Sequence, residues 1–254
     1  MTDTIRPTTS QDSAHRDTSL AVVTPRRSGE RGHADHGWLD TYHTFSFAGY
    51  HDPAFMGFGP LRVLNQDRVK PGRGFGTHGH QDMEIVSFVL DGVMAHKDSM
   101  GNGSEMRPGE VQLMSAGTGV MHSEFNASNA DGLHFLQMWV LPAEDRTTPR
   151  YDQKMFDVGE RRGQLRLVVS PDGAEGSLTI GQDARLYTGL FDAGEQASWT
   201  LGEGRGAWLH VAKGTVEVNG VMLDPGDGAA LEVGGKVEIV GLDDAELVLW
   251  DVAL

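Results

Sequence analysis

Short runs of apolar residues, separated by turn-forming residues, recur along most of the chain. In the first half they lie at residues 61–64, 84–90, 93–96, 110–114, 120–125 and 135–141. In the second half they lie at residues 165–169, 178–180, 184–190, 197–201, 208–212, 215–218, 229–233, 236–240 and 246–250. Runs of this length and spacing are typical of β-strands in a sandwich or barrel. The pattern predicts an all-β protein.

A polar stretch at residues 142–164 separates the two series of strands and contains Pro142 and Pro149. We therefore expect a first domain at residues 20–141, a linker at 142–164 and a second domain at 165–254. A further strand is expected near residues 20–23. Residues 1–19 have almost no large apolar side chains, and such a segment buries too little surface to offset its ordering entropy. The composition predicts a disordered tail there.

Composition narrows the class of protein. The 254 residues include 21 basic and 36 acidic side chains, which gives a formal charge of −15. An acidic surface repels phosphate backbones, so direct nucleic-acid binding is not expected. No apolar run approaches the ~20 residues that a membrane-spanning helix needs. The chain has no cysteine and no recognisable secretion signal, which favours a reducing cytoplasm.

Two short triplets carry the candidate chemistry: His78-Gly79-His80 and His122-Ser123-Glu124. Residues i and i+2 of a strand point to the same face, so each triplet can direct two metal-binding side chains into one interior. Three imidazoles and a carboxylate suit a redox-active metal such as Fe(II), and Mn, Co, Ni, Cu and Zn are also compatible. The second half has a single histidine, His210, and no such triplet. We expect one metal site, in the first half.

Longer motifs surround the triplets. Residues 72–84, closing at Gly92, resemble the first cupin motif, and residues 109–126 resemble the second. The second motif departs from the usual pattern, with Ser115 in place of Pro and four residues between Gly117 and His122. Together with residues 35–39, 43–48, 57–63 and 114–119, these departures resemble the pirin family. The resemblance is greatest to its bacterial members, some of which are quercetin 2,3-dioxygenases.

The resemblance implies a bicupin, in which two jelly-roll-like β-barrels pack face to face and only the N-terminal one binds metal. The ligands implied are His78, His80, His122 and Glu124, around one divalent ion per chain, with Fe(II) favoured. The resemblance also implies that Glu124 acts as the catalytic base, removing the 3-hydroxyl proton of a flavonol before dioxygen reacts. The C-terminal cupin would be degenerate and would shape one wall of the cleft.

Other polar and apolar residues have a structural and a functional interpretation. Glu84 lies where many cupins place their fourth ligand, but the resemblance leaves it outside the ligand set, either supporting a ligand or as an ordinary strand residue. Further histidines that could orient ligands, and are individually more often structural, are His33, His36, His43, His51 and His96. Side chains that could line an aromatic pocket, or form the core, are Phe45, Phe47, Phe75, Met114, Met121 and Met138.

Three functions fit this sequence. The leading hypothesis is a metal-dependent dioxygenase acting on quercetin or a related flavonol. The second is a non-enzymatic metal- or redox-sensing regulator that acts through a protein partner, because other pirins are transcriptional cofactors or bind metabolic enzymes. The third is a sugar- or small-acid-binding cupin with a structural metal, because fold alone does not decide function. A monomer is expected, since two cupins in one chain already supply the pairing that single cupins gain by dimerising.

Overall fold

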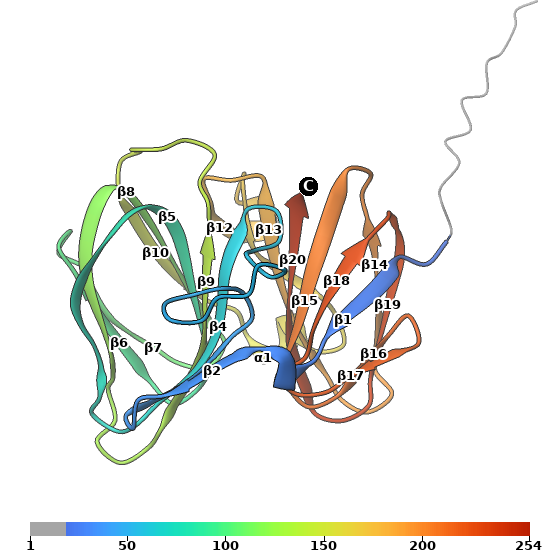
Figure 1. Cartoon of the computed structure of the whole chain (residues 1–254), viewed down its shortest axis with the longest axis horizontal. Helices are drawn as coiled ribbons and strands as arrows, with labels where there is room; N and C mark the ends of the chain where they lie inside the picture. Colours follow the sequence, from blue (N-terminus) through green and yellow to red (C-terminus); the bar gives the residue numbers. More distant parts are fainter. Residues whose placement is uncertain (1–18) are drawn as a thin grey trace, which may run out of the picture.

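Strands make up most of the structure, a computed structural model that describes residues 19–254 (Figure 1). The predicted disordered tail lies outside the described residues, apart from Ser19. The described part contains twenty strands, one short helix, α1 (Val158–Arg161), and two 3₁₀ turns at Ser28–Glu30 and Ala174–Gly176. The prediction of an all-β protein is confirmed. None of the helices in this part has the length and apolar character needed to cross a membrane.

The first half forms a nine-stranded sheet, drawn in blue to yellow-green in Figure 1. Eight strands follow one another in the sheet in this order: β2 (Gly32–Asp35), β3 (Leu39–His43), β4 (Leu61–Val69), β9 (Leu133–Val140), β5 (Gly74–Asp91), β8 (Glu110–Asn126), β6 (Met94–Asp98) and β7 (Gly103–Met106). The ninth, β10 (Arg150–Met155), pairs with the first part of β8. The strands β5 and β8, which carry the two triplets, lie side by side along most of their length.

The second half contributes two sheets. The seven-stranded sheet runs in the order β1 (Val22–Arg26), β18 (Gly228–Glu232), β15 (Arg205–Lys213), β20 (Ala245–Ala253), β13 (Ala184–Phe191), β11 (Arg166–Ser170) and β12 (Leu178–Thr179). The four-stranded sheet runs β14 (Gln196–Leu201), β19 (Gly235–Gly241), β16 (Val216–Val218) and β17 (Val221–Leu223). The hairpin between β16 and β17 turns at Asn219-Gly220, where both φ angles are positive, as a type I′ turn requires.

The strands β2, β3, β7, β10 and β17 are not predicted from the sequence, and three differences from the predicted pattern have a clear physical reason. The predicted strands at 110–114 and 120–125 form one strand, β8, because Gly117 and Gly119 adopt φ angles of 45° and 134° and carry the chain through without leaving the sheet. The predicted linker contains β10, whose residues are exposed or half-buried, so no apolar alternation marks it. The first strand, β1, pairs with β18 of the second half. The domain boundaries themselves stay a prediction.

The two halves pack face to face through a shared hydrophobic core. This core joins side chains of β4, β5 and β9 to side chains of β11, β13 and β20. Across it, the Trp250 indole N–H donates to Sδ of Met138 over 3.1 Å. Each sheet described here keeps edge strands in its pairing order, so strand pairing does not confirm closed barrels. A separate apolar cluster fills the space between the two sheets of the second half.

The first half differs from the second in carrying a buried polar row across its sheet. His43, Asn65, Gln137 and Ser87 are cross-strand neighbours on β3, β4, β9 and β5, and all are buried. Buried polar groups are unfavourable unless they are hydrogen-bonded or serve a site. The row therefore marks the interior of the first half as the place to look for chemistry.

Candidate metal centre

The two triplets meet because β5 and β8 are antiparallel and in register. His78 lies directly opposite His122, and His80 lies opposite Val120. Irregular pairing flanks this stretch, between Phe75 and His78 and again between His80 and Asp82. The i and i+2 positions of each triplet share one face. The structure thus brings His78, His80 and His122 together from segments more than 40 residues apart, while Glu124 is grouped with His122 and not with the other two.

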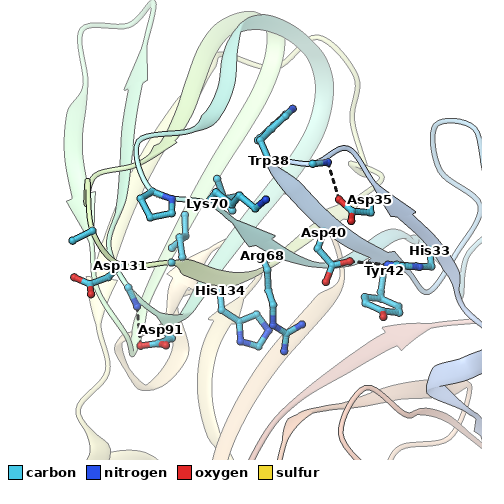
Figure 2. Close-up of a pocket in the computed structure, with 17 residues that line it drawn as sticks. His33, Asp35, Trp38, Asp40, Tyr42, Arg68, Lys70, Asp91, Asp131 and His134 are labelled. Atoms are coloured by element: carbon cyan, nitrogen blue, oxygen red, sulfur yellow. Dashed lines mark hydrogen bonds and ion pairs between the residues drawn. The ribbon is translucent and has the colours of Figure 1, made fainter.

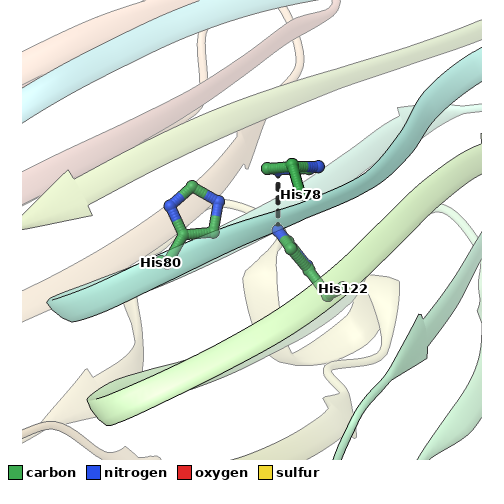
Figure 3. A group of neighbouring side chains, drawn as sticks. All are labelled: His78, His80 and His122. Atoms are coloured by element: carbon green, nitrogen blue, oxygen red, sulfur yellow. Dashed lines mark hydrogen bonds between the residues drawn. The ribbon is translucent and has the colours of Figure 1, made fainter.

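His78, His80 and His122, here called the imidazole triad, form a compact group (Figure 3). Their ring centroids are 4.5 to 4.9 Å apart. The Nε2 atoms of His78 and His122 are 3.0 Å apart. Nδ1 of His78 donates to the Gly76 carbonyl over 2.8 Å if it carries the ring proton, which leaves Nε2 with a lone pair.

The triad fits a divalent metal ion. Two facing imidazole nitrogens must share a proton or a cation, and a ring that donates through its far nitrogen to a carbonyl is the usual arrangement of a metal-bound histidine. Burial and the neighbouring imidazoles lower the pKa of His122 to about 3 and that of His80 to about 4. Both rings are therefore neutral at pH 7, the form that binds metal.

Glu124 extends the group on its buried side. Its carboxylate accepts a hydrogen bond from Gln137 Nε2 over 2.8 Å and one from Ser87 Oγ over 3.2 Å. It forms a second group with His96 and His122, whose ligand atoms all lie within 4.8 Å of one another. Burial raises the pKa of Glu124 to about 7, and the nearby Asp67 adds to the effect. The two groups share His122, which places Glu124 behind the imidazole triad.

His96 is one of the five histidines for which the sequence left a structural and a ligand-orienting role open, and the structure places it next to the site. It is buried on β6, directly opposite Glu124, and Asp98 is directly opposite His122. Its Nε2 lies 3.3 Å from Asp98 Oδ2, and its Nδ1 has no partner among the described residues. The sequence contains a pattern that indicates this position, since His96-Lys97-Asp98 repeats the i, i+2 spacing of the two triplets.

Glu84 and His210 lie apart from the imidazole triad. Glu84 is buried on β5, accepts a hydrogen bond from Ser115 Oγ over 2.8 Å and another from the backbone of Gly181. It joins the two halves of the chain, as a structural residue does. His210 is fully buried in β15 of the second half, and neither ring nitrogen has a partner in the described part of the chain. Burial lowers its pKa well below the ordinary value.

A cavity of about 580 Å³ opens onto the site. It is lined by His78, His80 and Glu124, by Asp67, and by the aromatic side chains Trp38, Phe47, Phe75 and Trp139. This volume suits a small organic molecule. Of the six apolar residues predicted as lining, only Phe47 and Phe75 face the cavity. Met121 directly precedes His122, and Met138 directly follows Gln137, so strand alternation turns both methionines away from the cavity. Phe45 and Met114 lie in core clusters.

A larger hollow, of about 1220 Å³, lies elsewhere on the first half and is lined by charged groups (Figure 2). Arg68 and Lys70 reach into it beside Asp40 and His134. It contains no member of the imidazole triad. Its acids and bases are spread over an open surface, so the smaller cavity is the one that bears on chemistry.

The paired sheets, together with the two overlapping groups of histidine and glutamate side chains found within residues 19–254, define the class of protein as a bicupin of the metal-binding type. Comparison with known families then gives the family. Residues 15–140 match the family described as Pirin, and residues 167–252 match the quercetinase C-terminal cupin domain. The chain belongs to the pirin family, as its motifs predict.

Individual relatives agree with this assignment. The quercetin 2,3-dioxygenase of Escherichia coli K12 is 47% identical over 227 residues, which cover 89% of this chain and 97% of that protein. A pirin-like protein of Caulobacter vibrioides is 42% identical over 224 residues, with 87% and 96% covered. The crystal structure of bacterial pirin YhhW from Escherichia coli in complex with nickel(II) has a TM-score of 0.86 at 46% identity and covers 91% of this chain and 99% of its own.

Proposed function

We propose that this protein is a metal-dependent dioxygenase that cleaves quercetin or a related flavonol. The observation that carries the proposal is the convergence of His78 Nε2 and His122 Nε2, 3.0 Å apart, at a 580 Å³ cavity with aromatic walls. Relatives that share 38 to 47% of their residues with this chain carry the name quercetin 2,3-dioxygenase, some of them provisionally. Both the site and the relatives favour an oxidoreductase.

The ligands we assign are His78, His80, His122 and Glu124, around one divalent ion per chain. We assign Fe(II), although a set of three nitrogens and one oxygen also accepts Mn, Co, Ni, Cu or Zn. When bound, the metal supplies open coordination positions for the hydroxyl and carbonyl oxygens of a flavonol and for dioxygen. The first domain, residues 20–141, holds the ion, and the second, residues 165–254, is a cupin without ligands behind a linker at 142–164.

Glu124 is the group that we assign as base. It takes the 3-hydroxyl proton of the flavonol and leaves an electron-rich enolate. A carboxylate that ligates a metal would be a weaker base than a free one, so this role would require one Glu124 oxygen to be available for the proton. Gln137 and Ser87 hold the carboxylate in place while this happens, because each donates to a different oxygen. The aromatic side chains around the cavity exclude water from the enolate.

A non-enzymatic regulator is the alternative. It would need a surface that changes with the metal's oxidation state, and a cavity would serve no purpose in it. The open cavity beside the imidazole triad favours the enzyme. We further assign a small aromatic substrate such as a flavonol, a protein partner as an additional candidate, a monomeric state and a cytoplasmic location. The last agrees with a chain that has no cysteine.

The test is metal content measured together with dioxygen uptake on quercetin, with protein purified without chelator and reloaded with Fe(II). One metal per chain and uptake that is lost in Glu124→Gln is the expected result. His210→Ala is the matched control, because His210 is buried in the other half and should change neither quantity. One metal per chain with no uptake on any flavonol, while a known dioxygenase turns over, would refute the proposal.

A further inference from the structure

Asp67 is an acidic residue of the cavity that the proposed chemistry does not use. It lies on β4, is only 4% exposed, and lines the same 580 Å³ cavity as His78 and Glu124. It is part of neither group of potential metal ligands among residues 19–254. Asp67 is therefore a carboxyl group of the cavity wall that lies outside both ligand groups.

The hydrogen bonding of Asp67 is incomplete. The Thr41 side chain, directly opposite on β3, hydrogen-bonds to its carboxyl group. The other oxygen, Oδ1, is buried and has no partner in the described part of the chain. A buried oxygen without a donor is unfavourable, so such an atom at a cavity wall indicates a donor that arrives with a ligand.

Burial raises the pKa of Asp67 to about 7, and the charge of Asp40 adds to the rise. Near neutral pH the carboxyl group is therefore present in both forms. In either form, Oδ1 can accept a hydrogen bond from a hydroxyl group. A fully charged ammonium ligand would lose its hydration among aromatic walls at a much greater cost than a hydroxyl does.

The remaining walls indicate what carries that hydroxyl. Trp38 and Phe75 meet edge to face with centroids 5.2 Å apart, and Phe47 and Trp139 do the same at 5.3 Å. Two aromatic pairs offer flat apolar surface to a planar ring system. Among the residues that line this cavity, Asp67 and Glu124 are the two with carboxyl groups, and only Asp67 lies outside the two ligand groups.

We propose that Asp67 is a specificity-determining residue that accepts a hydrogen bond from a ring hydroxyl of the bound substrate other than the hydroxyl at the metal. The inference rests on the proposed flavonol function and deepens it. A site built around a buried hydrogen-bonding group discriminates strongly against an analogue that lacks the matching hydroxyl, because the group is then left unpaired. The substrate class is thus a polyhydroxylated planar aromatic, and a bare chelating flavone is a poor ligand.

The test compares two ligands in the Ni²⁺-loaded protein without dioxygen, so that binding is measured and turnover is absent. Quercetin carries hydroxyls on both ring systems, whereas 3-hydroxyflavone keeps only the one that chelates the metal. Quenching of the cavity tryptophans reports binding. In the wild type we expect the Kd of quercetin to be lower by about 10- to 100-fold, the range of one hydrogen bond to a carboxyl group.

Asp67→Leu should raise the Kd of quercetin and leave the Kd of 3-hydroxyflavone nearly unchanged. The ratio of the two Kd values should therefore fall to less than about threefold. Asp131→Leu is the matched control, since Asp131 lines the charged hollow and not the cavity. Should Asp67→Leu fail to bind metal, Asp67→Ala also removes the acceptor without adding bulk and should reduce the ratio to less than about threefold as well.

Two results would overturn the inference. Equal affinities for the two flavonols in the wild type would do so directly. An unchanged ratio in a folded, metal-loaded Asp67 variant would do so while leaving the flavonol function intact. If neither compound bound the wild type, the proposed function would fail first and this inference with it.

Discussion

Gln137 on β9 donates a hydrogen bond to Oε2 of Glu124 on β8 over 2.8 Å, although β5 lies between the two strands. The side chains meet above β5, where the one hydroxyl proton of Ser87 is shared between Oε1 of the same carboxylate, at 3.2 Å, and Oε1 of Gln137, at 2.7 Å. The carboxylate is thus held by two donors from two strands. This support makes the orientation of Glu124 a property of the sheet, independent of any ligand.

Replacing Gln137 with Met removes the donor to Oε2 and keeps the volume. Loss of such an outer hydrogen bond typically weakens metal binding about 10- to 100-fold. We expect a fall of this size in the Ni²⁺ affinity, measured by competition with a chromogenic chelator. Gln112→Met is the matched control, because Gln112 is equally buried, its Nε2 has no partner within residues 19–254, and it makes no bond to Glu124. Equal losses in the two variants would contradict the assigned support.

His122→Ala removes the residue that the two ligand groups share. We expect the metal content to fall from about one ion per chain to less than about a tenth of an ion. Removing a ligand should weaken metal affinity by more than the ~100-fold loss that follows when a hydrogen bond to a ligand is removed. Elemental analysis after gel filtration measures it, and the melting temperature of the metal-loaded protein should fall as well. The same content in wild type and His122→Ala would refute the site.

The buried His134, which is not part of the imidazole triad, should make the free energy of unfolding depend on pH. Burial, then Arg68 and Lys213, lowers its pKa to about 3, and Gln66 Nε2 lies 2.9 Å from its Nε2. The unfolded chain has a histidine pKa near 6.5, so below that pH the unfolded state binds more protons and the free energy of unfolding falls as pH falls. Between pH 7 and 5.5 this residue contributes a loss of about 1 kcal/mol.

The measurement is urea unfolding of wild type and His134→Gln at both pH values. The variant should lose about 1 kcal/mol less than the wild type over this interval. The difference between the two proteins cancels the contribution of the other histidines, including the imidazole triad. An identical loss in both would show that His134 is protonated to the same extent in the folded and unfolded states.

Arg161 and Glu246 form a buried ion pair, 2.8 Å apart, between α1 and β20. Removing one partner of such a pair leaves a buried charge without its counter-ion. We expect Glu246→Leu to lower the free energy of unfolding by about 3–5 kcal/mol, because Arg161 then stays buried and unpaired. The double variant Arg161→Met/Glu246→Leu should recover most of that loss, because no charge remains buried. Chemical denaturation of the three proteins checks it, and additive losses would argue against coupling.

The four candidate metal ligands show how much of the site can be predicted from the local sequence. His78 and His80, like His122 and Glu124, share a face because alternation along a strand is a local property. The pirin motifs extended this to a family and a bicupin fold, both of which are confirmed. Their role as ligands stays a prediction that the proposed metal analysis tests.

Other parts of the site were beyond local reasoning. His96 and Asp67 entered the neighbourhood of Glu124 through cross-strand pairing and a shared cavity, and neither relation is visible in a run of ten residues. The strand β10 was hidden for a related reason, because its hydrogen bonds to β8 stabilise it and its side chains stay largely exposed. The hydrophobic pattern detects burial, and a strand at an exposed place leaves little trace in it.

The sequence by itself determined that the chain is all-β, that it belongs to the pirin family, and which four side chains stand in pairs on strand faces. These properties depend on alternation and on short motifs, which a linear chain carries within a few residues. Tertiary structure alone decided that β5 and β8 align His78 with His122, and that Gln137 and Asp67 complete the cavity. Register between distant strands depends on the packing of both faces at once, and no local segment contains that information.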